Sequence, residues 1–193
     1  MKIKPIIATL FLTFILNICF SQNSKTKQHT AEEIAEMDAN YKAKKEKDKE
    51  GRKELEGTTI NELFLEDIDG NKHTLESLKG KVVLMNFWFI HCKACVAEIP
   101  DLNMLKKKFN DKDVVFLAVA LDSKKSLDKF LETHDFDFTI IPKGRELAER
   151  LKIPHYPYNV ILDKTGKIQY VSDVLSLNMM NRLKRKINGL LKE

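Results

Sequence analysis

Apolar and polar blocks alternate along residues 57–193, and this alternation predicts strands and helices that follow one another in turn. Val82–Phe89 is an almost unbroken apolar run rich in β-forming residues, which is typical of a strand covered on both faces. Val114–Leu121 has the same character and predicts a second buried strand. The other expected elements are helices at Cys92–Phe109 (with a kink at Pro100), Lys124–His134, Arg145–Leu151 and Ser176–Leu191, and a short strand at Phe138–Ile141.

Two turn signals, Asp69-Gly70-Asn71 and Asp163–Gly166, predict β-hairpins at the two ends of this region. The order of elements, together with the length of a single domain, predicts an α/β fold. In this fold helices flank a central mixed β-sheet, and the first hairpin is an N-terminal extension. The strand pairs expected are Leu63–Ile68 with Lys72–Leu75, and Tyr158–Leu162 with Ile168–Val171.

The first 21 residues have the pattern of a secretory signal peptide. Lys2 and Lys4 precede an apolar run from Ile6 to Phe20, and small or polar residues follow it. The run is shorter than the roughly 20 apolar residues that a membrane-spanning helix needs, so cleavage after Ser21 is the favoured outcome. Lipidation at Cys19 is the alternative, although the residue before it is not small. We therefore expect an exported, periplasmic protein, either released or held at the membrane by an uncleaved or lipidated N-terminus.

Residues 22–56 form a charged segment in which Lys and Glu predominate. So polar a stretch cannot bury enough surface to offset the entropy of ordering it, which predicts a disordered linker or a solvated helix. Residues 30–50 contain good helix formers and allow ion pairs between neighbouring turns. The segment is interpreted as a solvated leader, and a partner-docking arm is the alternative.

The chain of 193 residues is 43% hydrophobic and 32% charged, which excludes collagen-like, mucin-like and wholly disordered classes. Its net charge is +5 with both signs interspersed, so we expect no nucleic-acid binding. There are three cysteines, at positions 19, 92 and 95. If cleavage removes Cys19, the two that remain form one Cys-x-x-Cys motif and no structural disulfide framework.

Cys92 and Cys95 stand where a buried strand ends and a helix begins. Two intervening residues put the sulfurs within reach of each other, and a helix N-terminus offers unpaired N–H groups and the positive end of the dipole. Lys93 adds a cation. The first thiol should therefore have a lowered pKa and act as the nucleophile, with Cys95 as the resolving thiol. A metal site is the alternative, but zinc normally needs four ligands, and the sequence has no second cysteine pair or His-x₃₋₅-His.

The stretch from Trp88 to Leu102 (WFIHCKACVAEIPDL) resembles the redox centre of exported TlpA/ResA-type thiol–disulfide oxidoreductases. Those proteins show a tryptophan upstream of Cys-x-x-Cys and Glu-x-Pro-x-Leu just after it. The resemblance extends over roughly residues 57–175. It implies a thioredoxin-like fold in which the Cys92–Cys95 disulfide is itself the redox cofactor, with no bound metal or organic group.

The resemblance also implies roles for residues near the cysteine pair. Pro157 matches a cis-proline that lies across from the cysteines, where the backbone of Tyr156 would pair with a substrate. Glu98, one turn after Cys95, matches a partly buried carboxylate that exchanges a proton with the resolving thiol. An ordinary exposed glutamate is the alternative interpretation of Glu98.

Three positions near the sulfurs depart from the family's pattern, namely His91, Lys93-Ala94 and Tyr156. Relatives commonly carry another residue before the first cysteine, a proline between the cysteines, and Thr or Val before the cis-proline. His91 and Lys93 are interpreted as residues that tune the thiolate, and Trp88 as either core packing or part of the substrate surface. Because Cys-x-x-Cys proteins span about −270 to −120 mV, the direction of electron flow stays open.

These features predict an exported thiol–disulfide oxidoreductase that reduces disulfides in periplasmic proteins. The resemblance implies protein thiols or disulfides as substrates, a membrane electron donor of the DsbD/CcdA type and a role in cytochrome c maturation, and we expect a monomer. A peroxiredoxin-type peroxidase is one alternative, but the Pro-x₃-Thr-x₂-Cys arrangement that it needs is missing before Cys92. A metal-handling module without enzymatic activity is the other, and its usual Cys-x₃-Cys spacing is missing too.

Overall fold

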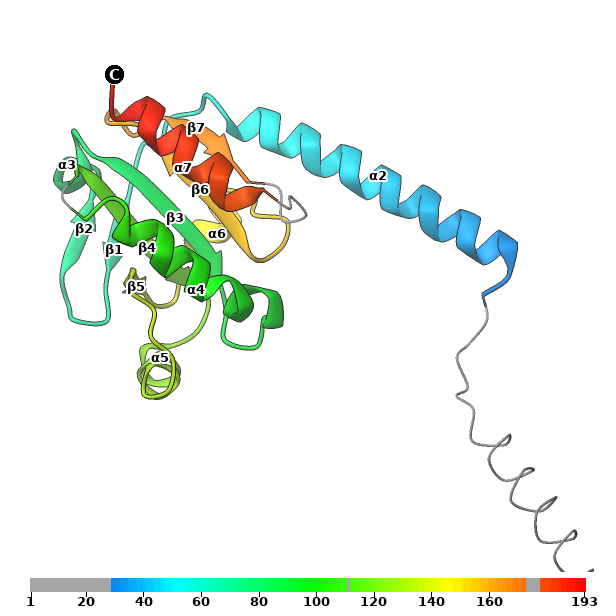
Figure 1. Ribbon diagram of the computed structural model, residues 1–193, viewed down its shortest axis with the longest axis horizontal. Coiled ribbons are helices and arrows are strands. Elements are labelled where there is room, and N and C mark those ends of the chain that lie inside the picture. The colour runs from blue at the N-terminus through cyan, green and yellow to red at the C-terminus, as the bar shows by residue number, and fades with distance from the viewer. Residues whose placement is uncertain (1–28, 111, 173–177) are drawn as a thin grey trace, which may run out of the picture. The chain divides into compact units, whose positions relative to one another are not determined.

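The computed structural model in Figure 1 describes residues 29–110, 112–172 and 178–193. The chain divides into two units, Met1–Lys44 and Lys45–Glu193. The expected signal peptide, residues 1–21, lies outside the described residues. Among the residues that are described, no helix is both long enough and apolar enough to cross a membrane.

The charged segment forms helix α2, Ala31–Leu55, which has no buried residue. Thr30 begins the helix with a capping box. The Glu33 N–H donates to Thr30 Oγ1 at 3.2 Å, and the Thr30 N–H donates to the Glu33 carboxylate at 2.8 Å. Ion pairs between turns, such as Lys49 with Glu46 at 3.2 Å, are exposed and each contribute only about 0.2–0.5 kcal/mol. Good helix formers, caps and local pairs therefore stabilise α2.

The central sheet has five strands in the order β5-β4-β3-β6-β7. β3, β4 and β5 run parallel to one another, while β6 pairs antiparallel with both β3 and β7. The sheet is therefore mixed and flanked by helices, as the order of elements predicts. The strands are β3 (Val82–Trp88), β4 (Val114–Ala120), β5 (Thr139–Ile141), β6 (Tyr158–Leu162) and β7 (Ile168–Val171).

Two layers of core side chains cover the two faces of this sheet. Helices α4 (Lys93–Lys107), α5 (Lys124–Leu131) and α7 (Met179–Leu190) pack on one face, and Figure 1 shows α4 and α7 side by side. The short helices α3 (Leu75–Leu78) and α6 (Arg145–Arg150) contribute to the core on the other face. All seven residues of β3 are buried, because alternate side chains enter one layer or the other.

A separate two-stranded hairpin precedes the sheet, with β1 (Phe64–Glu66) antiparallel to β2 (Lys72–Thr74). Asp67 organises its turn. One carboxylate oxygen of Asp67 accepts from the backbone N–H groups of Asp69 and Asn71, and the other lies 2.9 Å from His73 Nε2. Although burial raises the pKa of Asp67, the hydrogen bonds from His73, Asn71 and Asp69 lower it more, so the net pKa falls below 3.8.

Replacing Asp67 by asparagine is expected to lower the free energy of unfolding at pH 7 by about 1–3 kcal/mol, because the buried side chain at this position loses the charge that its hydrogen-bond donors stabilise. A folded-state pKa below the unfolded value gives stability that is present above the unfolded pKa and disappears as the pH falls through the folded pKa. The difference from the unsubstituted protein should therefore shrink below about pH 4. Urea unfolding at pH 7 and pH 3, with exposed Asp69→Asn as the control, measures this; an equal loss at both pH values would contradict it.

Backbone pairing also covers the β7 edge of the sheet. The Gly57 N–H donates to the Ile168 carbonyl and the Ile168 N–H donates to the Thr58 carbonyl, both at 2.8 Å. The Glu56 carboxylate accepts from the Val171 N–H at 3.1 Å. An exposed edge strand is a template for unwanted pairing between chains, and this segment occupies it.

Most of the predicted elements agree with the structure to within a few residues, and the differences lie at the ends of strands and helices. Helix α4 begins at Lys93, because Cys92 is its N-cap, and α5 ends at Leu131. Helix α7 begins at Met179, and the first two residues expected in it, 176 and 177, lie outside the described part of the chain. Helix α3 was not predicted, because four residues are too few for a periodic pattern; a capping box between Thr74 and Ser77 starts it.

Candidate active site

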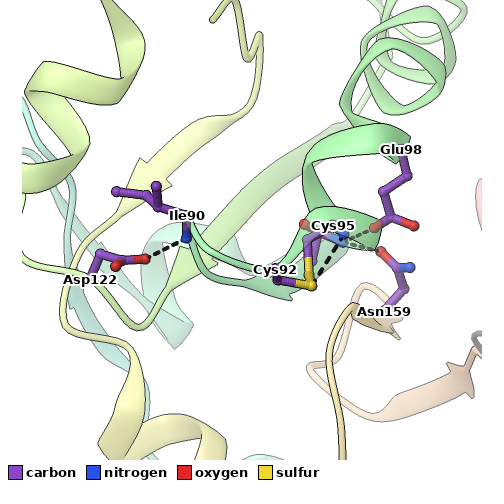
Figure 2. Close-up of a disulfide and its surroundings, with 7 residues drawn as sticks. Ile90, Cys92, Cys95, Glu98, Asp122 and Asn159 are labelled. Carbon is purple, nitrogen blue, oxygen red and sulfur yellow. Dashed lines mark hydrogen bonds between the residues drawn. A yellow bond between two sulfur atoms is a disulfide. The ribbon is translucent and has the colours of Figure 1, made fainter. Parts of the chain in front are cut away.

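Cys92 and Cys95 form a disulfide at the N-terminal end of α4 (Figure 2), with their Cα atoms 5.2 Å apart. Cys92 is 8% exposed, whereas Cys95 is only 1% exposed. Cys92 is therefore the more accessible residue of the pair. Access to a protein substrate is what an attacking thiol needs.

The start of α4 favours a thiolate on Cys92. Its Sγ accepts a hydrogen bond from the Cys95 N–H at 3.2 Å, in the position where an N-cap side chain satisfies a free backbone donor. The first turn of α4 carries no acidic residue that would oppose a negative charge. Lys93 and His91 are both exposed beside the pair. In the reduced protein, the helix end would stabilise the Cys92 sulfur anion.

Glu98 lies one turn beyond Cys95 on α4, and Figure 2 shows it beside the cysteine pair. Its carboxylate is partly buried and accepts a hydrogen bond of 2.8 Å from Asn86 Nδ2. Burial raises the pKa of Glu98 to about 7, the hydrogen bond from Asn86 lowers it, and the negative charge of Asp101 raises it. A carboxyl group with this pKa can both accept and donate a proton near neutral pH.

Two buried asparagines next to Glu98 are site residues that the sequence analysis missed. Asn86 of β3 is 1% exposed and Asn159 of β6 is 0% exposed, and they are register partners. Asn86 Nδ2 donates to Asn159 Oδ1 at 3.0 Å. A signal was present in the sequence, since an asparagine inside each of the apolar runs VVLMNFW and YNVIL is a buried polar group that needs a partner.

The Tyr156–Pro157 peptide bond is cis, as the resemblance implied. The Tyr156 ring meets the Phe89 ring edge to face, with 5.6 Å between the ring centroids, and both side chains are half-buried. Phe89 and Ile90 lie in the segment leading to Cys92, and like Tyr156 they are half-buried and keep part of their apolar surface exposed. The sequence analysis did not single out Phe89 and Ile90. The Asp122 carboxylate, at the end of β4, accepts from the Ile90 N–H at 2.8 Å and holds this segment in place (Figure 2).

Trp88 lies in the core and not on the substrate surface. It is 0% exposed, and its ring lies 5.3 Å from both the Phe130 and the Phe136 rings. Of the two interpretations that the sequence allowed, the structure supports packing, because a fully covered indole cannot contact a substrate. Its position at the end of β3 explains how a core residue can stand four positions before the nucleophile.

A metal site is not formed by the described residues. In the parts of the chain that the structure describes, no three His, Cys, Asp or Glu side chains lie close enough together to hold a metal ion. His91 and His155, the histidines that could in principle join the cysteine pair as ligands, do not form such a cluster. The site therefore consists of the Cys92–Cys95 pair, the Glu98 carboxyl group and an apolar rim. The rim is formed by the half-buried side chains of Phe89, Ile90 and Tyr156.

Comparison with known proteins finds a matching family and several similar proteins. The AhpC/TSA family profile matches residues 57–171. The chain is 34% identical over 117 residues to the thioredoxin-like protein YneN of Bacillus subtilis (strain 168), which covers 59% of this chain and 69% of that protein. It is 32% identical over 122 residues to the thiol–disulfide oxidoreductase ResA of Bacillus thuringiensis subsp. konkukian (strain 97-27), covering 62% and 70%.

The fold has solved counterparts as well. The crystal structure of the thioredoxin domain of a thiol–disulfide oxidoreductase from Bacteroides vulgatus superposes with a TM-score of 0.61 and 25% sequence identity. The match covers 69% of this chain and 98% of the other chain. The expected thioredoxin-like fold, with its mixed sheet and N-terminal hairpin, is therefore confirmed.

Proposed function

Because this chain belongs to the AhpC/TSA family and is a TlpA/ResA-like thiol–disulfide oxidoreductase, we propose that it is a reductase of disulfides in exported proteins. Oxidoreductases of this kind use their own cysteines, so the Cys92–Cys95 pair is the redox group and no cofactor is needed. One observation carries the proposal: Cys92, the N-cap of α4 and the more accessible residue of the pair, is disulfide-bonded to Cys95, and the carboxyl group of Glu98, with a pKa of about 7, lies one turn away.

In the first step, the Cys92 thiolate attacks one sulfur of a substrate disulfide. A bond forms between Cys92 Sγ and that sulfur, the substrate S–S bond breaks, and the other substrate sulfur leaves as a thiolate that takes a proton. The product is a mixed disulfide between the protein and its substrate. The Cys95 N–H, which donates to Cys92 Sγ at 3.2 Å, holds the attacking sulfur at the end of α4.

In the second step, the Cys95 thiol gives its proton to the Glu98 carboxylate and attacks Cys92 Sγ. The mixed disulfide breaks, the second substrate sulfur leaves and takes up a proton, and the Cys92–Cys95 disulfide forms. Two electrons have then moved from the protein to the substrate. A dithiol donor must return them before the next turnover, and on re-reduction Glu98 can give the proton back to Cys95.

The apolar rim beside Cys92 supports protein substrates. Phe89, Ile90 and Tyr156 are half-buried, so they offer apolar surface without being lost in the core. In this proposal, the backbone of Tyr156, next to the cis-proline Pro157, pairs with an extended substrate segment. The site is therefore suited to a cysteine in an extended peptide with apolar neighbours.

The first 21 residues support export, with release after Ser21 or retention through an uncleaved or lipidated N-terminus as the two outcomes. In the periplasm, the proposed electron donor is a membrane protein of the DsbD/CcdA type, and the proposed task is reduction of protein disulfides to thiols during processes such as cytochrome c maturation. We propose that the protein acts as a monomer.

The equilibrium reduction potential of the Cys92–Cys95 pair tests the direction of electron flow. Equilibration in glutathione buffers should give about −250 mV or lower, the range of thioredoxin-like reductants. A value near about −120 mV would make the protein an oxidant and would overturn the reductase assignment. Turnover of insulin disulfides with dithiothreitol, compared with peroxide consumption, is the matching activity assay. Peroxide consumption without insulin reduction would contradict the proposal as well.

A further inference from the structure

A line of buried polar groups crosses the sheet and ends at Glu98. It runs from Ser172, which follows β7, through Asn159 of β6 and Asn86 of β3, to the carboxylate on α4. Ser172, Asn159 and Asn86 are all at most 1% exposed. Asn86 donates to both Asn159 and Glu98 and so links them; Figure 2 labels Asn159, Glu98 and the two cysteines. Buried polar groups need partners, so each amide in this line must have a definite orientation.

The Asn86 amide is oriented by two acceptors. Its Nδ2 donates to Glu98 Oε1 at 2.8 Å and to Asn159 Oδ1 at 3.0 Å. An amide nitrogen has two hydrogens, so these two bonds use both of them. If Asn159 offered no acceptor, one hydrogen of Asn86 would have no partner in the core, and rotation of the amide would also remove the bond to Glu98.

The Asn159 amide is oriented in turn by Met179 of α7, the helix that packs on the same face of the sheet as α4. Its Nδ2 donates to Met179 Sδ at 3.4 Å. A thioether sulfur can only accept, so the nitrogen of Asn159 points to Met179 and its oxygen points to Asn86. The backbone of Asn159 is held by Ser172, because the Asn159 N–H donates to Ser172 Oγ at 3.1 Å and the Ser172 N–H donates to the Asn159 carbonyl at 2.9 Å.

We propose that Asn159 is a positioning residue for proton transfer: it holds the Asn86 amide so that Nδ2 donates to the Glu98 carboxylate. Asn159 acts through Asn86 and does not touch the reacting sulfurs. The inference rests on the proposed function, in which the positioned Glu98 carboxylate takes the proton of Cys95. Its geometry stands independently of the substrate and of the electron donor.

Two other influences act on Glu98 and remain unchanged when Asn159 is altered. Burial and the negative charge of Asp101, on the same helix, both disfavour the ionised carboxylate. The hydrogen bond from Asn86 favours it. Loss of the positioning contact should therefore shift the titration of Glu98 upward, toward the value that burial and Asp101 alone would set.

Asn159→Val and Asn159→Thr form a matched pair that tests this inference. Both remove the amide and its bond to Met179, and they have nearly the same shape, but only threonine keeps an oxygen that can accept from Asn86. We expect the pKa of Glu98 to rise by about half a pH unit or more with valine, about a threefold change in proton affinity. Threonine should reverse part of this pKa shift, because its hydroxyl oxygen can accept from Asn86. The reversal should be partial, since this hydroxyl lies one bond closer to the backbone than the amide oxygen of Asn159.

The measurement is carbon NMR of the Glu98 carboxyl group against pH in the full protein with its disulfide intact, with Glu98→Gln to identify the signal. The side-chain amide signal of Asn86 should follow the same titration in the unsubstituted protein and stop following it with valine. An unchanged Glu98 titration with valine, or an equal shift with both variants, would overturn the inference. Since no substrate or donor is present, failure of the reductase assignment would leave this test intact.

Discussion

Replacing Cys92 by serine is expected to lower the rate of protein disulfide reduction at least about 1,000-fold, because a hydroxyl group is not ionised near neutral pH and cannot form the mixed disulfide. Replacing Cys95 by serine should also stop turnover, but after the first step. The Cys92 thiolate would still attack, and the mixed disulfide would accumulate because nothing resolves it. Turnover with a disulfide-containing protein, and the mass of the trapped adduct, measure the two outcomes.

Ala94→Ser is the matched control, because it places a hydroxyl in the same turn and leaves both sulfurs in place. Its turnover should remain near that of the unsubstituted protein. If Cys92→Ser accumulated the adduct and Cys95→Ser did not, the two sulfurs would have exchanged roles. That result would contradict the assignment made from their 8% and 1% exposures.

Replacing Glu98 by glutamine is expected to slow the resolving step about 100- to 10,000-fold above pH 7, the usual range for loss of a general base. The pKa of Glu98 is about 7, so the carboxylate that accepts the Cys95 proton is the minor form below this pH and the major form above it. The rate of resolution in the unsubstituted protein should therefore rise through about pH 7. Rapid mixing of the mixed disulfide over a pH range measures this inflection.

Asp101→Asn is the control for Glu98→Gln, since it removes an exposed carboxylate from the same helix and leaves Glu98 in place. It should keep the inflection but move it to a slightly lower pH, because the charge of Asp101 raises the pKa of Glu98. An inflection that survives in Glu98→Gln at the same pH would belong to another group and would contradict the role given to Glu98.

Replacing Glu98 by glutamine should also stabilise the folded protein at alkaline pH. The pKa of Glu98 rises from 4.5 to about 7 on folding, so the folded state binds the proton more tightly than the unfolded state does. Stability from this proton is present below about pH 4.5 and falls as the pH rises to about 7, where the buried carboxylate ionises. Glu98→Gln should thus be more stable by about 2–3 kcal/mol at pH 8 and nearly equal at pH 4, as urea unfolding would show. Equal stability at pH 8 would mean that Glu98 is solvated.

The positions of strands β4, β6 and β7 were predictable because the pattern that specifies them is local. β6 and β7 have the bounds that the hairpin signal predicted, and β4 differs by a single residue, since each is a short apolar run between turn residues. Helix α3 could not be found in this way, because it has four residues and depends on a capping box. The ends of α4 and α5 moved for a similar reason, as caps and not periodicity decide where a helix stops.

The burial of Trp88 could not be predicted from the residues that neighbour it in the sequence. A tryptophan four positions before a nucleophilic cysteine can lie on the surface or in the core, and the sequence allowed both. Phe130 and Phe136, on α5 and the segment after it, decide between them by covering the indole. Those residues come 42 and 48 positions later in the chain, so their contact with Trp88 follows from packing alone.

The sequence by itself determined the two thiols, their order and their place between a strand and a helix, because those features belong to neighbouring residues. Only the tertiary structure decided which sulfur is accessible and how Glu98 titrates. Asn86 and Asn159 are separated by 73 positions and meet because β3 and β6 pair in one register. The pKa of a carboxyl group depends on the burial, charges and hydrogen bonds around it. At Glu98 the hydrogen bond comes from Asn86 on β3, which Asn159 on β6 holds in place, and the charge comes from Asp101 on α4. No local pattern of residues specifies this combination.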